Sequence, residues 1–443
     1  MRIGLVAMSG IRCHDAELMS LGLTLPGFVE RSKTIASLPS LGLLTLAGMT
    51  PPEHEVRYLE VPDIRVAGTL PDGFDLVGIS SYSAQIDEAY ELADRYRATG
   101  VPVVLGGPHV SVLPHEAGTH ADAVVVGHGE LHWPAVLADA AAGTLEPVYG
   151  ALEDDYDFAD APMPAFHLLD IECYNRLTIQ TSRGCPHRCE FCAGSLLFCH
   201  RYRQKPAAAV LAELDRILEV WKHPFIELAD DNSFVNRAYW LELLPELARR
   251  HIRWFAETDI SVGKDDELLD LLRESGCAEV LIGLESPVPG CLDGVEARAN
   301  WKRKHVARYR GALQNIQEHG IRVNGCFVLG LDGQGPEIFD QVRAFVRDAD
   351  LFDVQITLLT PFPGTPLYAR LKAEGRLLAE GDWKRCTLFD LNFRPSGMSA
   401  EELAAGFRSL GADIYSTEWT ERRRHRFNER LRAHRQKEKE SSA

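Results

Sequence analysis

Three closely spaced cysteines are the residues in this chain best suited to chemistry. Cys185, Cys189 and Cys192 lie in residues 181–192, TSRGCPHRCEFC, with three residues between the first two and two between the last two. Thiolates at this spacing can hold an iron–sulfur cluster, and a four-iron cube with three cysteine ligands leaves one iron free to bind a reactant. Structural zinc, with Cys199 as fourth ligand, is the alternative, although zinc sites usually join two short-spaced pairs and no second pair follows.

The cysteine spacing and the flanking Arg-Gly-Cys-Pro and Phe-Cys pairs resemble the radical SAM superfamily. The resemblance implies a [4Fe–4S] cluster that is held by Cys185, Cys189 and Cys192 and binds S-adenosylmethionine (SAM) through its free iron. One electron delivered to the cluster would then cleave SAM to a 5′-deoxyadenosyl radical. An external electron donor such as flavodoxin or ferredoxin is therefore also implied.

Composition limits the possible partners and the cellular compartment. The chain has 443 residues, 45% hydrophobic and 25% charged, which suits a folded protein of two or three domains. Its formal charge of −17 disfavours nucleic acid binding, and the basic tail at 422–439 contains glutamates that favour a solvent-exposed helix instead. The apolar run at residues 3–8 is shorter than that of a signal peptide, and nowhere do eighteen apolar residues run unbroken, so we expect a cytoplasmic protein without a membrane span.

Residues 1–150 alternate short apolar runs with helical patterns. Strands are expected at 3–8, 56–61, 76–80, 101–105 and 123–126, and helices at 38–49 and 84–98. This alternation indicates an α/β domain with a doubly wound, Rossmann-like parallel sheet, in which ligands bind beyond the carboxyl ends of the strands. The residues expected there are Ser80, Ser81, Tyr82, Ser83, Gly106, Gly107, Pro108, Gly127, Gly129 and Glu130.

As a set, these loops and residues 38–44 resemble the cobalamin-binding domain that is fused to many radical SAM enzymes. The resemblance implies that the nucleotide tail of cobalamin enters the sheet edge near the serine and Gly-Gly loops, where glycines allow close approach to the backbone. The Asp-x-His-x-x-Gly motif that ligates cobalt in mutases is absent. We therefore expect no histidine beneath the cobalt, and we expect His109 and His128 to be turn or surface residues.

A second domain is expected after an acidic, proline-bearing linker at 151–175. Six strand-then-helix units occupy residues 176–375, with strands expected at 177–182, 225–229, 253–258, 279–284, 322–329 and 354–359. Six such units fit a partial (β/α)6 barrel, whose active site lies at the carboxyl ends of the strands. Residues 376–443 are expected to form a short helical C-terminal segment with a charged tail.

Residues that follow the first two barrel strands are implied by the resemblance to contact SAM. Phe191 would lie against the adenine, beside the cluster. Asp230 and Asp231 offer carboxylates that could receive the α-ammonium group of SAM. Either could instead cap the helix that starts near Asn236, and both roles could hold at once.

Four further SAM contacts are expected from the later strands. Glu257 and Glu285 follow the third and fourth strands, where a carboxylate could accept hydrogen bonds from the ribose. Val328 lies in a glycine-bounded strand end that resembles the family's Gly-x-Ile-x-Gly pattern, in which backbone packs on adenine. Pro361 begins a rigid turn that closes the barrel beside SAM in relatives.

The resemblance covers about residues 1–420 and implies a cobalamin-dependent radical SAM methyltransferase of the class B type. In such enzymes one SAM methylates cobalamin, and a second yields the radical that removes hydrogen from an unactivated carbon, or from phosphorus, which then takes the methyl group. The C-terminal segment resembles those of enzymes that act on hopanoids and other hydrophobic molecules, so a natural-product or lipid-like substrate of secondary metabolism is expected. Two alternatives stay open: radical cyclisation, rearrangement or oxidation with a vestigial cobalamin domain, and a cobalamin or zinc binding module without catalysis.

Overall fold

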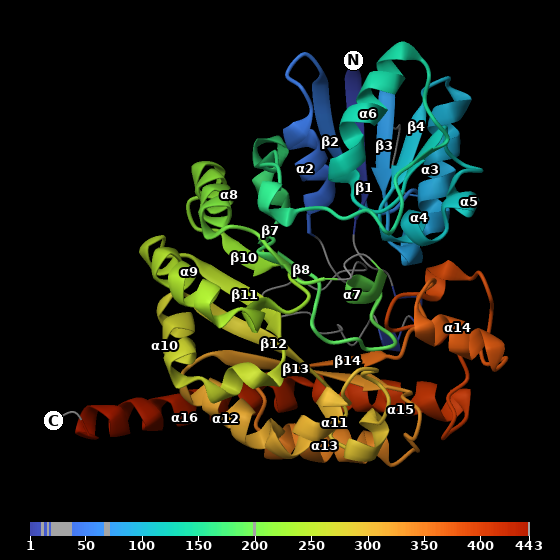
Figure 1. Ribbon diagram of the computed structural model, residues 1–443. Coiled ribbons are helices and arrows are strands. Elements are labelled where there is room, and N and C mark those ends of the chain that lie inside the picture. Colours follow the sequence, from blue (N-terminus) through green and yellow to red (C-terminus); the bar gives the residue numbers. More distant parts are fainter. Residues whose placement is uncertain (10–12, 16, 19–37, 66–70, 198–200, 442–443) are drawn as a thin grey trace.

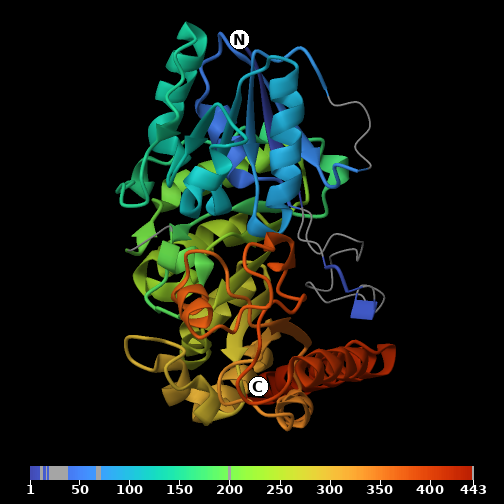
Figure 2. The same ribbon diagram turned by 90° about the vertical axis from the view of Figure 1, so that its right-hand side faces the viewer.

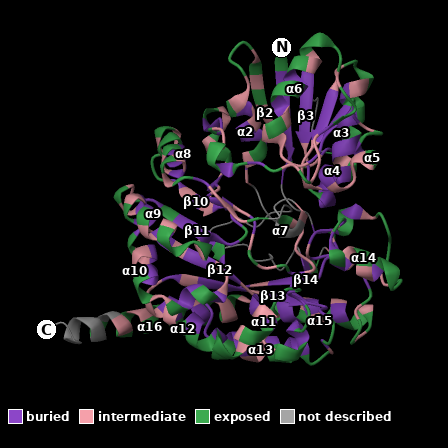
Figure 3. Ribbon diagram, viewed as in Figure 1, coloured by how far each residue is buried: buried purple, intermediate pink, exposed green. Residues whose placement is uncertain are grey.

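Two parallel sheets, one above the other in Figure 1, carry most of the chain. The computed structural model describes residues 1–441 apart from 10–12, 16, 19–37, 66–70 and 198–200. Cys199, the fourth ligand of the zinc alternative, lies outside the described residues. Both sheets are buried across their centres, as Figure 3 shows.

The first sheet and its helices occupy residues up to 149. Its elements are β1 (Arg2–Met8), α2 (Leu41–Met49), β2 (Glu55–Val61), β3 (Leu76–Ser80), α3 (Ile86–Ala98), β4 (Val103–Gly106), α4 (Pro108–Val112), α5 (Pro114–Ala117), β5 (Ala123–Val125), α6 (Gly129–Ala142) and β6 (Val148–Tyr149). The strand order is β2-β1-β3-β4-β5-β6, and neighbouring strands are parallel. Helices α2 and α6 cover one face and α3, α4 and α5 cover the other, which confirms the predicted doubly wound fold.

The second sheet follows from residue 177. Its strands are β7 (Leu177–Ile179), β10 (Phe225–Leu228), β11 (Arg253–Thr258), β12 (Cys277–Glu285), β13 (Arg322–Leu329) and β14 (Asp353–Leu358), and its helices are α7 (Ala193–Leu197), α8 (Ala207–Val220), α9 (Arg237–Arg249), α10 (Asp266–Glu274), α11 (Trp301–His305), α12 (Tyr309–Glu318) and α13 (Ile338–Asp348). A short antiparallel pair, β8 (Ser182–Arg183) with β9 (Arg203–Gln204), follows β7. Within the described residues the parallel order is β14-β13-β12-β11-β10-β7, and no pairing joins β7 to β14, so the predicted partial (β/α)6 barrel is confirmed.

Helices α14 (Pro366–Ala373), α15 (Ala400–Ile414) and α16 (Thr417–Ser441) complete the chain. Helix α15 begins at a capping box in which Ser399 and Glu402 satisfy each other's backbone N–H groups. The end of α16 projects away from the body of the molecule (Figure 1), and the first sheet lies above the second in both views (Figures 1 and 2). Among the described residues, no helix has the length and apolar character needed to cross a membrane.

Two expectations about the connecting regions are corrected by the structure. The segment at 151–175 is not an exposed linker throughout, because Tyr156 and Phe158 are buried and lie against the guanidinium group of Arg183. His109 is not a surface residue, because it is 1% exposed and its imidazole lies between Ser83 and Glu116. Local sequence patterns do not reveal these contacts, since Arg183 and Ser83 are more than twenty residues from their partners and Glu116 lies in a different helix from His109.

Candidate active site between the two sheets

The three predicted cluster cysteines lie in the loop between β8 and α7. Cys189 is buried and Cys185 and Cys192 are half-buried, all three as free thiols. Burial and the charges of the neighbouring thiols raise the pKa of Cys185 to about 11 and that of Cys189 to about 12. The thiols are therefore near enough to act on one another, but within the described residues no group of three or more His, Cys, Asp or Glu side chains lies in position to hold a metal ion.

The surroundings of these thiols fit an anionic, thiolate-bound cluster. The amide nitrogen Nδ2 of Asn232 donates a hydrogen bond to Sγ of Cys185 at 3.9 Å. The ammonium group of Lys302 lies near Cys189 and lowers the pKa of its thiol. Donors and positive charge around the sulfurs stabilise deprotonated cysteines and tune the cluster that they hold.

Backbone contacts fix the cysteine loop against residues 295–301. Glu190 N–H donates to the carbonyl of Val295 at 3.0 Å, and Ala297 N–H donates to the carbonyl of Arg188 at 2.9 Å. The buried carboxylate of Glu296 accepts hydrogen bonds from several backbone N–H groups, including that of Arg188 at 3.2 Å. Burial would raise the pKa of Glu296, but these hydrogen bonds outweigh it and lower that pKa.

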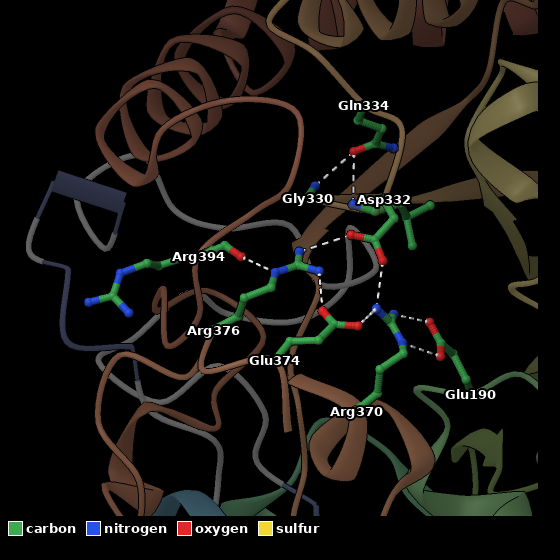
Figure 4. Close-up of polar contacts among 9 residues, drawn as sticks. Glu190, Gly330, Asp332, Gln334, Arg370, Glu374, Arg376 and Arg394 are labelled. Carbon is green, nitrogen blue, oxygen red and sulfur yellow. Dashed lines mark hydrogen bonds and ion pairs between the residues drawn. The ribbon is translucent and has the colours of Figure 1, made fainter. Parts of the chain in front are cut away.

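An arginine network joins the same loop to the end of β13 and to α14 (Figure 4). Arg370 donates to both carboxylate oxygens of Glu190, at 3.1 and 2.6 Å, and also to Asp332 at 2.7 Å. Asp332 and Glu374 both accept from Arg376, at 2.9 and 2.8 Å. Because Glu190 lies between two cluster cysteines, a bidentate arginine contact holds its backbone in place.

Replacing Arg370 with alanine is expected to loosen the cysteine loop. We expect the free energy of unfolding to fall by about 1 kcal/mol, because these ion pairs are partly exposed, and the KM for SAM to rise by about three- to tenfold. Lysine at position 370 should restore only part of the effect, since it cannot make the bidentate contact. Arg250→Ala removes a comparable bidentate pair with Asp215, so it is the control that should leave the KM unchanged. An unchanged KM in the Arg370 variant would contradict this role.

The two aspartates after β10 differ in what they can offer a ligand. Oδ1 of Asp230 accepts from the backbone N–H groups of Thr181 and Ser182, at 2.7 and 2.9 Å, and Oδ2 accepts from the Thr181 hydroxyl. Asp231 accepts from Gly184 N–H at 2.9 Å and lines a cavity of about 430 Å³. The carboxylate of Asp231 is therefore the more available of the pair, and it lies next to the cysteine loop. The helix α9 is capped by Asn236 rather than by either aspartate.

Glu285 has the strained backbone and the buried ion pair typical of functional sites. Its φ of 60° is unusual for a residue other than glycine, and it coincides with a register shift between β12 and β13. Its Oε1 lies 2.6 Å from Nζ of Lys302, which also donates to the carbonyl of Gly283 at 2.8 Å. Burial would lower the pKa of Lys302, but Glu285 and Cys189 together raise it, so the ammonium stays charged beside the cysteine loop.

Glu257 lies at the floor of a second cavity, of about 650 Å³, between the two sheets. Its side chain is exposed to this cavity, where the enclosing protein and the nearby carboxylates of Glu227 and Asp231 raise its pKa to about 8. A neutral carboxyl in a cluster of acidic groups is poised to ionise when a cation arrives.

None of the three remaining predicted SAM residues lines either cavity. Phe191 is half-buried and packs against the barrel core. Val328 is buried, and its carbonyl accepts from Nε2 of Gln334 at 3.1 Å. Pro361 is also buried, in the turn between β14 and α14.

A slot at the carboxyl edge of the first sheet gathers most of the residues predicted to hold cobalamin. The cavity of about 430 Å³ is lined by Ser80, Tyr82, Gly106, Gly107, Pro108, Gly127, Gly129 and Glu130. A Cβ at Gly107 would lie 2.8 Å from Oγ of Ser80, whereas one at Gly106 would meet nothing closer than 3.9 Å. Glycine at these positions keeps the slot open, which fits the entry of a cofactor tail.

The slot is continuous with the cavity between the sheets. Ser80, Tyr82, Gly107, Glu130 and Arg183 line both. Tyr82 is 57% exposed despite its large ring and therefore projects into this space. Ser81 lines the second cavity, whereas Ser83 lines neither, because it is buried against His109.

Arg183 is a site residue that sequence reasoning did not assign. It donates to Glu130 at 2.6 Å and to Nδ1 of His128 at 3.2 Å, so it links the barrel to the first helix turn of α6. It belongs to the conspicuous Arg-Gly-Cys-Pro stretch, but its partners are more than fifty residues away in sequence. Nothing local could have revealed that contact.

Comparison with known proteins decides the family. Residues 179–346 match the Radical SAM superfamily, residues 33–137 match the B12 binding domain, and residues 365–443 match a domain of unknown function (DUF4070). An uncharacterized methyltransferase of Synechocystis is 30% identical over 368 residues, which cover 81% of this chain and 67% of that protein. The chain belongs to the cobalamin-dependent radical SAM methyltransferases.

Other relatives support the same family, and a solved structure shares the fold. Bacteriochlorophyllide d C-12(1)-methyltransferase of Chlorobaculum tepidum is 28% identical, covering 86% of this methyltransferase and 83% of that protein. Hopanoid C-2 methylase of Rhodopseudomonas palustris is 30% identical, covering 77% and 66%. The structure of the radical SAM methyltransferase TsrM from Kitasatospora setae, with cobalamin and a [4Fe–4S] cluster bound, has the same fold, with a TM-score of 0.63 at 19% identity and coverage of 86% and 76%.

The predicted cofactors and reaction class are therefore confirmed. The methyltransferase uses a [4Fe–4S] cluster, SAM and cobalamin, and it methylates carbon. The zinc module and the binding module without catalysis are set aside by the same matches.

Proposed function

We propose that the methyltransferase acts on an unactivated carbon of a polycyclic, hydrophobic small molecule held between its two sheets. The observation that carries this is the continuity of the glycine-lined slot with the cavity above the barrel. The slot is also lined by Asp231 and Gly194, beside the cysteine loop. A bacteriochlorophyllide and a hopanoid, named for two relatives, are both polycyclic and largely apolar. When bound, the cluster and SAM supply the hydrogen-abstracting radical, and cobalamin supplies the methyl group.

In this proposal, the cysteine loop and the barrel floor bind the cluster and SAM. We assign Cys185, Cys189 and Cys192 as cluster ligands. Asp231 receives the α-ammonium group of SAM, and Asp230 positions the turn before the first cysteine through its backbone hydrogen bonds. Glu257 provides a second carboxylate that stabilises the positive charge of bound SAM.

The first sheet binds cobalamin through its strand-end loops. Gly106, Gly107 and Gly127 line the slot for the nucleotide tail, and Tyr82 packs against the corrin where the slot opens. Removal of hydrogen from an sp3 carbon needs no acid or base from the protein. Its side chains instead exclude water and hold the reacting carbon between the two cofactors.

A reduced carrier protein such as flavodoxin or ferredoxin supplies the electron in this proposal. The free cysteines suit a reducing compartment, in keeping with the cytoplasmic location expected from the sequence.

Binding of SAM near Glu257 is expected to release a proton at pH 7. With a pKa of about 8 in the empty site, this carboxyl is mostly protonated at pH 7, and a neighbouring cation stabilises its ionised form and lowers that pKa. Proton release should fall towards zero above pH 9, where the group is already ionised, and SAM affinity should rise between pH 6 and pH 8.5. Calorimetry of the oxidised, reconstituted enzyme in buffers of different ionisation enthalpy counts the protons.

The matched control for this titration is Glu279→Gln. Burial also raises the pKa of Glu279 to about 8, but this residue lies in β12 outside both cavities. Glu257→Gln should abolish the proton release, and Glu279→Gln should leave it unchanged. Equal release in both variants would remove Glu257 from the SAM site.

A substrate panel with methyl-labelled SAM tests the proposed function. The reconstituted enzyme is incubated anaerobically with a hopanoid, a chlorin, a steroid, free tryptophan and a short peptide. Label in one or more polycyclic compounds supports the proposal. Label in tryptophan or the peptide alone, or 5′-deoxyadenosine without any methylated product, contradicts it, and the second result would favour the radical rearrangement alternative.

A further inference from the structure

A strongly basic stretch lies beside the cysteine loop of an otherwise acidic protein. Residues 296–310 contain six cationic side chains and one carboxylate, whereas the whole chain has a formal charge of −17. The basic tail at 422–439 carries interspersed glutamates, whereas this stretch has a single carboxylate. Its charged residues are Glu296, Arg298, Lys302, Arg303, Lys304, Arg308 and Arg310.

Some of these cations are already neutralised and others are not. Lys302 is buried against Glu285, Arg303 pairs with Asp293 at 3.0 Å, and Arg310 pairs with Asp348 at 3.2 Å. Among Arg188 and the cations of residues 296–310, four are exposed and have no ion-pair partner within the described part of the chain. These four, named here the basic face, are Arg188, Arg298, Lys304 and Arg308.

The basic face is joined directly to the cluster ligands. Arg188 is the neighbour of Cys189, and an isolated antiparallel bridge pairs Cys189 with Glu296, two residues before Arg298. Lys304 and Arg308 are four residues apart in consecutive helical turns, so they lie on the same side. The face therefore covers the cysteine loop from the side of α11.

Aromatic side chains connect α11 to the loop beneath the basic face. The imidazole of His187, between two of the cluster cysteines, lies 4.3 Å from the Trp301 ring, centroid to centroid. Trp301 in turn stacks on His305 at 4.1 Å. These packed rings join α11 to the cysteine loop through contacts of aromatic side chains, and a filled path of this kind favours electron tunnelling.

We propose that the basic face is the docking site for an acidic, low-potential electron-carrier protein that reduces the cluster. This inference rests on the proposed function, because a radical SAM enzyme needs one electron for each SAM that it cleaves reductively. One electron leaves the reduced carrier and enters the oxidised cluster, and the carrier departs oxidised by one electron. The unpaired exposed cations of the basic face attract an acidic partner to this part of the surface. The negative charge on the rest of the protein repels the partner and so favours a single docking orientation.

The expected complex is weak, brief and sensitive to salt. Electron-transfer complexes bury small areas, and their affinity rests on surface charge that salt screens. A nucleic acid is the other polyanion that such a face could bind, but the remaining negative charge of this chain would oppose a long polyanion. Because the basic face contacts the cysteine loop, an electron-carrier protein is favoured over a nucleic acid as its partner.

The test compares two triple variants with the same change of charge. Arg298→Glu with Lys304→Glu and Arg308→Glu reverses most of the basic face and leaves the cysteine loop intact. The control, Arg216→Glu with Lys222→Glu and Arg249→Glu, changes exposed residues of α8, α9 and the turn after α8. For each reconstituted enzyme, the Kd for oxidised bacterial flavodoxin is measured by fluorescence at low and moderate salt, with a single-stranded RNA oligonucleotide as a second probe.

The basic-face variant is expected to raise the Kd for flavodoxin by at least about tenfold, and the control to change it less than about twofold. Formation of 5′-deoxyadenosine should fall accordingly with reduced flavodoxin but remain normal with dithionite in both variants. Unchanged flavodoxin affinity in the basic-face variant, equal losses in the two variants, or binding of RNA without flavodoxin would each overturn the proposal. Loss of the dithionite-driven reaction in the parent enzyme would instead indicate failure of the proposed function.

Discussion

Replacing Cys189 with alanine is expected to abolish reductive SAM cleavage while the protein stays folded. The cluster needs all three thiolates, and Cys189 is the most buried of them, beside the charged ammonium of Lys302. An alanine there leaves only two of the three thiolates proposed as ligands. 5′-Deoxyadenosine should fall below detection, with iron content reduced and the unfolding midpoint little changed.

The control for this loss is Cys277→Ala. Cys277 is also buried in the barrel half, but it lies at the start of β12, at the opposite end from the cysteine loop, and its thiol contacts only the backbone carbonyl of Glu279 in the described contacts. It should retain the full cluster and normal SAM cleavage. Full 5′-deoxyadenosine production by Cys189→Ala, or by the Cys185 or Cys192 variant, would show that the cluster is held elsewhere.

Replacing Gly106 with leucine is expected to separate the two cofactors. An added Cβ meets nothing closer than 3.9 Å, so the fold should tolerate the change, but the rest of the side chain extends into the slot. Overpacking of about 1–3 kcal/mol corresponds to about 5–150-fold weaker cobalamin binding. Methylated product should fall by a similar factor at limiting cobalamin, whereas the iron content and SAM cleavage to 5′-deoxyadenosine should remain.

Gly106→Ala is the matched control, because a single methyl group fits at ordinary contact distance. It should bind cobalamin almost as well as the parent protein, as measured by corrin absorbance after gel filtration. Normal corrin content in the leucine variant would mean that the slot does not hold the cofactor tail.

The sequence was sufficient to predict both sheets, because apolar strands buried on two faces produce continuous hydrophobic runs that local patterns reveal. β1, β3, β11 and β13 lie within a residue of their expected positions. β6 was missed, since its two residues are too short to form a pattern. β4 begins at Val103 rather than Val101, after a proline that cannot donate to a sheet ladder.

The candidate site was only partly predictable. The cysteine triad and the glycine loops are local motifs, so their positions follow from the order of the strands. The contacts that fix them, such as Glu190 with Arg370 and Arg183 with Glu130, join residues 180 and 53 positions apart. Ion pairs of this kind leave no periodic signal, and the difference between Asp230 and Asp231 depends on which backbone N–H groups each carboxylate meets.

The methyltransferase is expected to hold a cysteine-bound cluster and cobalamin on opposite sides of one cavity. The most direct measurement is anaerobic reconstitution with iron, sulfide and hydroxocobalamin, followed by quantitation of iron and corrin in the parent, Cys189→Ala and Gly106→Leu proteins. One four-iron cluster and one corrin are expected per parent chain, with Cys189→Ala losing the iron and Gly106→Leu losing the corrin. A parent chain that binds the cluster but no corrin, or two variants that each lose both cofactors while remaining folded, would contradict it.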